Sequence, residues 1–128
     1  MKTGKSKTTT KNDEWSRLSA EILAFRDARD WKQFHTPKNL AAGISIESAE
    51  LLEHFLWCTD EEAKALVRDK AKCRAVSEEL ADVVNYALLL ADCLEIDLPA
   101  AIRRKIRINA RKYPVRKSKG RAAKYTEL

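Results

Sequence analysis

The chain has 128 residues, a net charge of +6 at pH 7, 45% hydrophobic residues and 34% charged residues, which fits one domain with a packed core. Three glycines and three prolines are too few for the tight turns of an all-β protein, and no apolar run approaches the roughly 18 residues of a membrane span. Three widely spaced cysteines fit reduced thiols better than a disulfide framework, so we expect a cytoplasmic protein without a membrane partner.

Helical periodicity runs through most of the chain, and no strand pattern competes with it. The polar, basic segment 1–12 is expected to be disordered, and Asp13 is the predicted N-cap of the first helix. The basic segment 115–128 is expected to be a tail packed on the domain formed by residues 13–114. The sequence therefore predicts an all-α bundle of four to five helices, at about 14–31, 38–57, 60–69, 73–95 and 98–113.

The net charge hides a strong asymmetry along the chain. Residues 1–12 carry +4 and residues 103–128 carry +10, which leaves −8 for residues 13–102. Two interpretations stay open at this point. The basic segment 103–124 could bind nucleic acid. Alternatively, the acidic groups could hold a metal ion while the basic groups hold phosphates.

Four carboxylates occupy positions that helical periodicity predicts to be buried. Glu47 falls within the apolar stripe of the second helix and Glu50 lies beside it, while Glu79 and Asp82 project among apolar residues of the fourth helix. Unpaired buried carboxylates are costly and repel one another, and a divalent cation removes both problems. The alternative is that they pair with Lys or Arg across the bundle. No Glu-x-x-His motif accompanies them, so Mg²⁺ is favoured over a redox metal.

The fifth helix offers ligands for phosphate. Asn109 lies in its inner stripe, with Lys105 and Lys112 beside it. Two ammonium groups and an amide next to an acidic, metal-binding face suit a polyphosphate, although such lysines can also extend along apolar surface into water.

Aromatic side chains gather at helix ends. Trp31, His35 and Trp57 lie at a break or at the end of a predicted helix, where packing in the core is least demanding. They could stack on a base, or they could close the ends of the bundle.

Taken in order, these motifs resemble those of dCTP pyrophosphatases within the all-α nucleoside triphosphate pyrophosphohydrolase (MazG-like) superfamily. The resemblance covers about residues 14–128. Its acidic motifs alone are weakly specific, but their order and the accompanying aromatic and Lys/Asn motifs make it strong. The matching segments are 25–40, 47–57, 79–86, 105–114 and 124–126.

The resemblance implies hydrolysis of dCTP or related nucleoside triphosphates to the monophosphate and pyrophosphate, as in cleansing of the nucleotide pool. It implies an oligomer, dimer or tetramer, with sites between subunits, and it makes nucleic acid the less favoured partner. It further implies Mg²⁺, or Mn²⁺ in its place, at the carboxylates that carry out catalysis. By this resemblance the metal ligands are Glu47, Glu50, Glu79 and Asp82, the phosphate ligands are Lys105, Asn109, Lys112 and Tyr113, and the base and sugar contacts are Trp31, His35, Trp57 and Tyr86.

Overall fold

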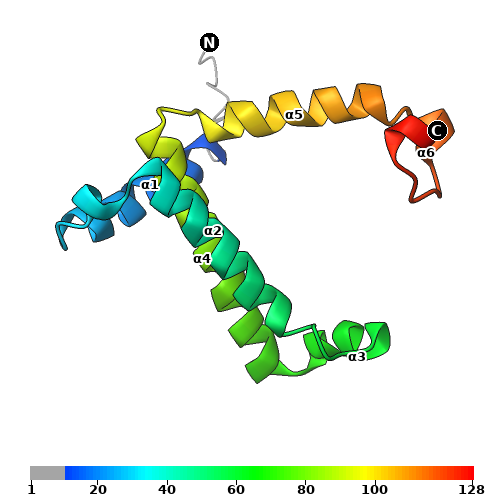
Figure 1. The fold of residues 1–128 in the computed structure, drawn as a ribbon, viewed down its shortest axis with the longest axis horizontal. Helices are drawn as coiled ribbons and strands as arrows, with labels where there is room; N and C mark the ends of the chain where they lie inside the picture. Colours follow the sequence, from blue (N-terminus) through cyan, green and yellow to red (C-terminus); the bar gives the residue numbers. More distant parts are fainter. Residues whose placement is uncertain (1–10) are drawn as a thin grey trace, which may run out of the picture. The chain divides into compact units, whose positions relative to one another are not determined.

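The computed structural model describes residues 11–128, so the disorder predicted for residues 1–10 lies outside the described part. Within 11–128 every regular element is a helix, which confirms the all-α prediction (Figure 1). The chain forms two compact units, the first ending at Leu94 and the second comprising Glu95–Leu128. None of the described helices combines the length and apolar character that crossing a bilayer requires.

Helix α1, Lys11–Asp27, differs from its prediction at both ends. It begins at Lys11, before Asp13, so the prediction that Asp13 is the N-cap is wrong. It ends at Asp27 rather than near Trp31, because Asp30 adopts a positive φ of 52° that a helix cannot accommodate. A short 3-10 turn, η1, follows at Lys32–Phe34.

The next helices begin at the caps that their sequences favour. Helix α2, Pro37–Glu53, starts behind Thr36, whose hydroxyl accepts a hydrogen bond from the backbone N–H of Asn39 at 3.2 Å. It ends four residues before the predicted Trp57, where the chain passes into turns. A capping box of Thr59 and Glu62 opens α3, Asp60–Ala65, and the 3-10 turn η2, Leu66–Arg68, continues it.

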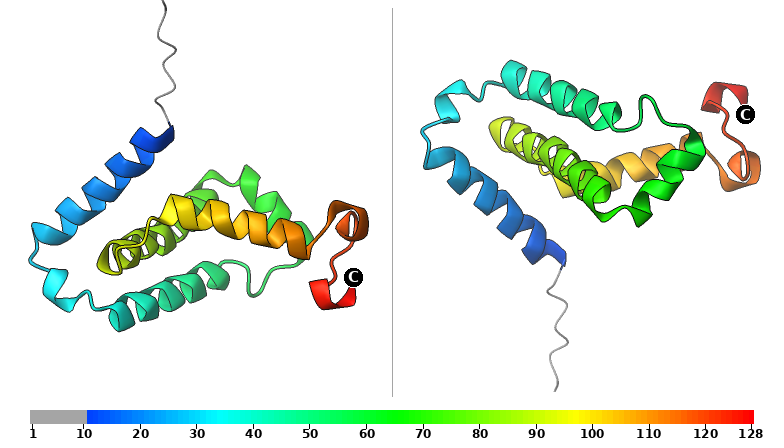
Figure 2. Two further views of the ribbon diagram at one scale, coloured as in Figure 1. Left: turned by 90° about the horizontal axis from the view of Figure 1, so that it is seen from above. Right: turned by 90° about the horizontal axis from the view of Figure 1, so that it is seen from below.

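Helix α4, Lys70–Cys93, packs antiparallel against α2 and forms the centre of the first unit (Figures 1 and 2). It begins three residues before the predicted Cys73, because the side chain of Asp69 caps it by accepting a hydrogen bond from the N–H of Lys72. Leu40 on α2, 1% exposed, and Leu88, Leu89 and Ala91 on α4 are buried. These apolar side chains provide the hydrophobic stabilisation of the pair.

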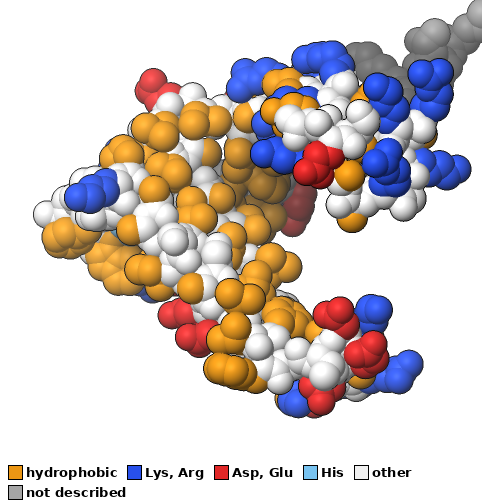
Figure 3. Space-filling model, turned by 45° about the vertical axis from the view of Figure 1, so that its right-hand side comes forward, with side chains coloured by type: hydrophobic (Ala, Val, Ile, Leu, Met, Phe, Trp, Pro, Cys, Tyr) orange, Lys and Arg blue, Asp and Glu red, His pale blue; other side chains and the backbone are white. Residues whose placement is uncertain are grey.

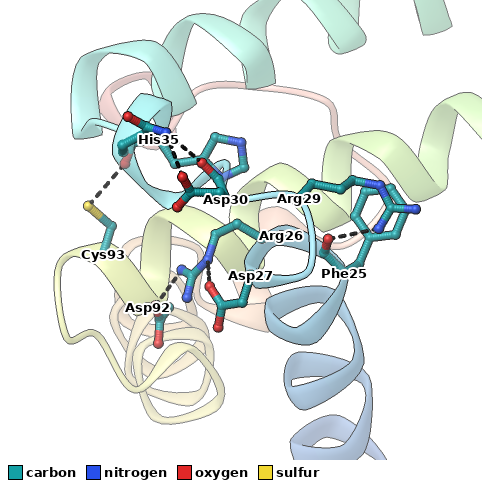
Figure 4. A network of polar contacts seen from close by, with 9 residues as sticks. Phe25, Arg26, Asp27, Arg29, Asp30, His35, Asp92 and Cys93 are labelled. Atoms are coloured by element: carbon teal, nitrogen blue, oxygen red, sulfur yellow. Dashed lines mark hydrogen bonds and ion pairs between the residues drawn. The ribbon is translucent and has the colours of Figure 1, made fainter.

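A buried arginine ties the end of α1 to the end of α4. Arg26 is 6% exposed, and its guanidinium donates to Asp27 at 2.8 Å and to Asp92 at 3.0 Å (Figure 4). The hydrogen bond to Asp27 is the main cause that raises the pKa of Arg26, and the same bond lowers the pKa of the Asp27 carboxyl. The carbonyl of Arg26 also accepts from the N–H of Trp31 at 3.2 Å, which fixes the start of the following loop.

The second unit consists of α5, Leu98–Lys112, α6, Val115–Ser118, and the 3-10 turn η3, Tyr125–Glu127. Asp97 caps α5 by accepting from the N–H of Ala100 at 3.0 Å. The rings of Tyr113 and Tyr125 meet edge to face at 6.0 Å, and the ammonium of Lys112 lies 4.9 Å from the Tyr125 ring centroid. The C-terminal segment therefore folds back onto the end of α5.

Many large apolar side chains remain open to solvent, as the face drawn in Figure 3 shows. On the first unit they include residues of α2, of the turn after it and of η2. Contiguous apolar surface of this kind is typical of regions that pack against another protein surface. Examples are Phe34, Ile46, Leu52, Leu56, Trp57, Val67 and Leu80.

We expect Arg26→Met to destabilise the first unit by about 1–3 kcal/mol, because a buried guanidinium loses charge-assisted hydrogen bonds. Urea unfolding at pH 7 measures this loss. The control is Arg74→Met, which breaks an exposed ion pair with Glu78 at 3.4 Å and should change stability by about 0.5 kcal/mol or less. The lowered pKa of Asp27 means that the stability its ion pair with Arg26 contributes is present above the usual carboxyl pKa and is lost as pH falls through the folded pKa. The difference in stability between wild type and Arg26→Met should therefore shrink in acid.

Equal losses of stability in Arg26→Met and Arg74→Met would contradict a stabilising role for the buried guanidinium.

Candidate active site

Two helices bring the predicted carboxylates together. Glu47 and Glu50 lie one turn apart on α2, and Glu79 lies on α4. One carboxylate oxygen from each of these three residues lies within 4.8 Å of the other two. The antiparallel packing of α2 on α4 therefore produces a cluster of hard oxygen ligands, which suits a divalent cation such as Mg²⁺.

Asp82 lies at the edge of this cluster. It is not among the three residues whose oxygens meet within 4.8 Å, but its charge acts on both Glu47 and Glu79. It also lines the neighbouring cavity together with Glu47. Asp82 is thus placed to face both a bound cation and a ligand in the cavity.

Burial and mutual repulsion perturb the titration of the cluster. The pKa of Glu47 is raised chiefly by desolvation, then by hydrogen bonding to Glu50 and by the charges of Glu50, Asp82 and Glu79. The pKa of Glu79 is raised for the same first reason, with the charges of Glu50 and Asp82 next, while His54 acts in the opposite direction. Both shifts reflect carboxylates that are partly desolvated and held close to one another, which is the condition that a cation relieves.

A cavity of about 750 Å³ adjoins the carboxylates and lies among α1, α4 and the loop at 31–35. Its walls on α1 and α4 are mainly apolar, with Ile22, Leu80 and Leu88 among the lining residues. Five of the predicted site residues line it, namely Trp31, His35, Glu47, Asp82 and Tyr86. A largely apolar cavity of this size with a few polar groups is typical of a small-molecule site.

The loop at 31–35 contributes Trp31 and His35 to the lining of this cavity. The Trp31 ring lies 5.8 Å from Phe25, edge to face, and 6.4 Å from the His35 ring. Nδ1 of His35 is buried and has no hydrogen-bond partner among the described residues, while the His35 carbonyl accepts from Sγ of Cys93 at 3.6 Å.

The remaining predicted residues lie elsewhere. Trp57 follows the end of α2, is 90% exposed and does not line the cavity. Lys105, Asn109 and Lys112 lie on α5, and Tyr113 is its C-cap, so all four belong to the second unit. Their roles therefore stay predictions.

Two residues that the sequence interpretation did not select belong to the surroundings of the site. His54, the C-cap of α2, acts on the charge of Glu79. Its position one turn after Glu50 is a signal that helical periodicity could have shown. Arg26 lines the cavity and anchors the loop of Trp31, and its burial depends on an ion pair with the distant Asp92 that periodicity cannot reveal.

Sequence similarity assigns the chain to a known family. The model of the MazG-like family matches residues 42–128, so the chain belongs to the MazG-like family. It is 43% identical over 112 residues to dCTP pyrophosphatase 1 of Bos taurus and 42% identical over 112 residues to dCTP pyrophosphatase 1 of Homo sapiens. Each match covers 88% of this chain, which spans 64% of the length of these relatives. The crystal structure of a pyrophosphatase from Archaeoglobus fulgidus is similar with a TM-score of 0.71 and 43% identity, covering 89% of this chain and 98% of that one.

We expect Glu47→Gln to raise the melting temperature of the metal-free protein, because it removes one charge from the cluster. Mg²⁺ should raise the melting temperature of the wild type by mass action and should stabilise Glu47→Gln much less. The control is Glu53→Gln, at the exposed C-terminal end of α2, which should leave both values near those of the wild type. Equal effects of the two substitutions would show that Glu47 does not belong to a cation site.

The raised pKa values of Glu47 and Glu79 also predict a pH dependence. The folded protein binds more protons than the unfolded chain between the usual and the raised pKa, so these groups lower stability as pH rises through that interval. The stabilisation of metal-free Glu47→Gln over wild type should therefore be largest at neutral pH, should diminish as pH falls through the raised pKa, and should be lost below the usual value of 4.5. Thermal unfolding of both proteins in EDTA across this range measures it. A difference that is independent of pH would contradict the perturbed titration.

Proposed function

We propose that the chain is a Mg²⁺-dependent nucleoside triphosphate pyrophosphohydrolase that converts dCTP, or a related nucleotide, to the monophosphate and pyrophosphate. The observation that carries the proposal is a carboxylate cluster beside a nucleotide-sized cavity, in a chain of the MazG-like family. The printed activity of its relatives, dCTP pyrophosphatase 1, supports the choice of substrate.

In this proposal the acidic cluster is the metal site. Glu47, Glu50 and Glu79 ligate from two helices, and Asp82 completes the set from the cavity side. A divalent cation held by these residues would supply positive charge for the phosphates and would lower the pKa of a water molecule near the α-phosphorus. The apolar walls of the cavity restrict water, and the packed helices hold the carboxylates in place before the substrate arrives.

The aromatic end of the cavity takes the nucleoside. Trp31 offers a ring for stacking on the base, and the His35 ring lies beside it at the lining of the cavity. Tyr86 lies on α4, one turn after Asp82, and lines the same cavity, so we assign it to the sugar. Trp57 lies outside the cavity of its own chain, so we assign it to base binding in the site of another subunit.

Helix α5 supplies the phosphate ligands. Lys105 and Lys112 carry charge that a triphosphate needs, Asn109 is one turn from Lys105, and Tyr113 follows the helix. An oligomer, dimer or tetramer, is part of the proposal. The exposed apolar side chains of the first unit support it, because packing them against other copies of the chain would remove their apolar surface from water.

A panel of nucleotides tests the proposed function. Purified protein is incubated with dCTP, CTP, dTTP and dATP in Mg²⁺, without added pyrophosphatase, and the products are separated. Monophosphate and pyrophosphate in equal amounts, abolished by EDTA, are expected, with dCTP among the best substrates. Inorganic phosphate without pyrophosphate would contradict the proposed bond cleavage. Binding of nucleic acid that weakens with salt and ignores Mg²⁺, with no hydrolysis, would favour the alternative of a nucleic-acid-binding protein.

Substitutions should separate recognition of the base from recognition of phosphate. Trp31→Ala should change the ranking of dCTP, dTTP and dATP by about ten- to hundredfold, because it removes a stacking surface worth about 1–3 kcal/mol per base. Lys105→Ala should weaken all three by a similar factor, because an ammonium group responds to charge. Arg103→Ala, which removes an exposed charge on the same helix, is the control for Lys105 and should have little effect. A uniform loss in Trp31→Ala together with a lower melting temperature would show a packing role instead.

A further inference from the structure

Gly43 occupies the middle of α2, where a glycine lowers helix stability relative to alanine. Its backbone needs no glycine, because the described residues with positive φ are Asp30, Glu95 and Gly120. It is buried against α4, so its lack of a side chain must serve the packing.

The ring of Tyr86 fills the place where a side chain at residue 43 would stand. A Cβ built on Gly43 would lie 2.5 Å from Cε1, 2.7 Å from Cδ1 and 2.9 Å from Cζ of Tyr86. Real Cβ atoms essentially never approach carbon so closely, so any side chain at this position has to displace the ring. The Tyr86 ring therefore packs directly against the backbone of Gly43.

This contact lies one turn from the carboxylates on both helices. Gly43 precedes Glu47 by four residues on α2, and Tyr86 follows Asp82 by four residues on α4. Glu47, Asp82 and Tyr86 all line the same cavity. Because the α2 backbone lies against one side of the ring, we expect a Cβ at residue 43 to displace the ring toward the cavity. The carboxylates, one turn away on each helix, should keep their positions.

We propose that Gly43 is a positioning and specificity-determining residue, which sets how far the Tyr86 ring enters the cavity and so how much room the nucleoside has. This inference rests on the proposed function, in that the cavity takes a nucleoside triphosphate. Gly43 acts through Tyr86 and touches no substrate atom. A Cβ at residue 43 narrows the cavity, and the larger of two otherwise equal substrates suffers more.

The test compares Gly43→Ala with Ser45→Ala, a matched control at an exposed position of the same helix. The substrates are dCTP and CTP, which differ by one oxygen. Gly43→Ala should raise KM for dCTP about tenfold with kcat changed less than about threefold, and should reduce kcat/KM for CTP further still. Ser45→Ala should match the wild type.

A second background shows whether the ring transmits the effect. Tyr86→Ala removes the ring atoms that the new Cβ would meet, so adding Gly43→Ala to it should change KM by less than about twofold. The double variant should also melt at or above the temperature of Tyr86→Ala, since alanine favours the helix. This arm decides the question even if Gly43→Ala alone does not fold. A loss of stability or activity of the same size in both backgrounds overturns the proposal.

Metal binding provides a readout other than activity. The rise in melting temperature caused by Mg²⁺ should be the same in Gly43→Ala as in the wild type, because the carboxylates keep their places. Loss of that rise would show that Gly43 sets the spacing of the two helices, and the proposal would be wrong. A wild type that does not hydrolyse dCTP rejects the proposed function itself, whereas an active wild type and an unchanged Gly43→Ala reject this inference alone.

Discussion

The close, antiparallel packing of α2 on α4 is the constraint on which the site depends. Leu40 and Leu89 are buried in it, and the Gly43–Tyr86 contact brings the two backbones together. Each turn along α2 is matched by a turn back along α4, so Glu47 faces the region of Asp82 and Glu50 that of Glu79. A shift of one residue in either helix would rotate a carboxylate by about 100° and scatter the cluster.

That packing holds like charges together at a cost to the metal-free protein. Glu47 and Glu79 have raised pKa values because burial and neighbouring carboxylates oppose their ionisation. The ion pair of the buried Arg26 with the partly exposed Asp92 ties α1 to the opposite end of α4, and the Arg26 carbonyl accepts from the N–H of Trp31 at the start of the loop. Metal-dependent enzymes commonly hold repelling ligands close together before the cation binds and fix them with contacts from surrounding residues.

The two units differ in what they can contribute. The first unit contains the carboxylates and the cavity, whereas α5 and the C-terminal segment carry 11 of the 25 Lys and Arg residues and a single acidic residue. Tyr125 packs on Tyr113 and under Lys112, so the end of the chain supports the helix that carries the proposed phosphate ligands. The first unit also carries large exposed apolar side chains, on which the proposed oligomer rests.

Helical periodicity and capping residues determined the secondary structure, because those signals are local. Helices begin where the sequence predicted them, behind the caps Thr36, Thr59 and Asp97. Spacing alone also placed Glu47 within the apolar stripe of its helix and Glu50 beside it. The early end of α1 was not visible from spacing, because it depends on the positive φ of Asp30. Only tertiary structure decided that Trp31 and His35 share a cavity with Asp82 while Trp57 does not. It also decided the partners of Arg26 and Gly43, because contacts between residues far apart in sequence depend on how helices pack, and a single helix carries no record of its neighbour.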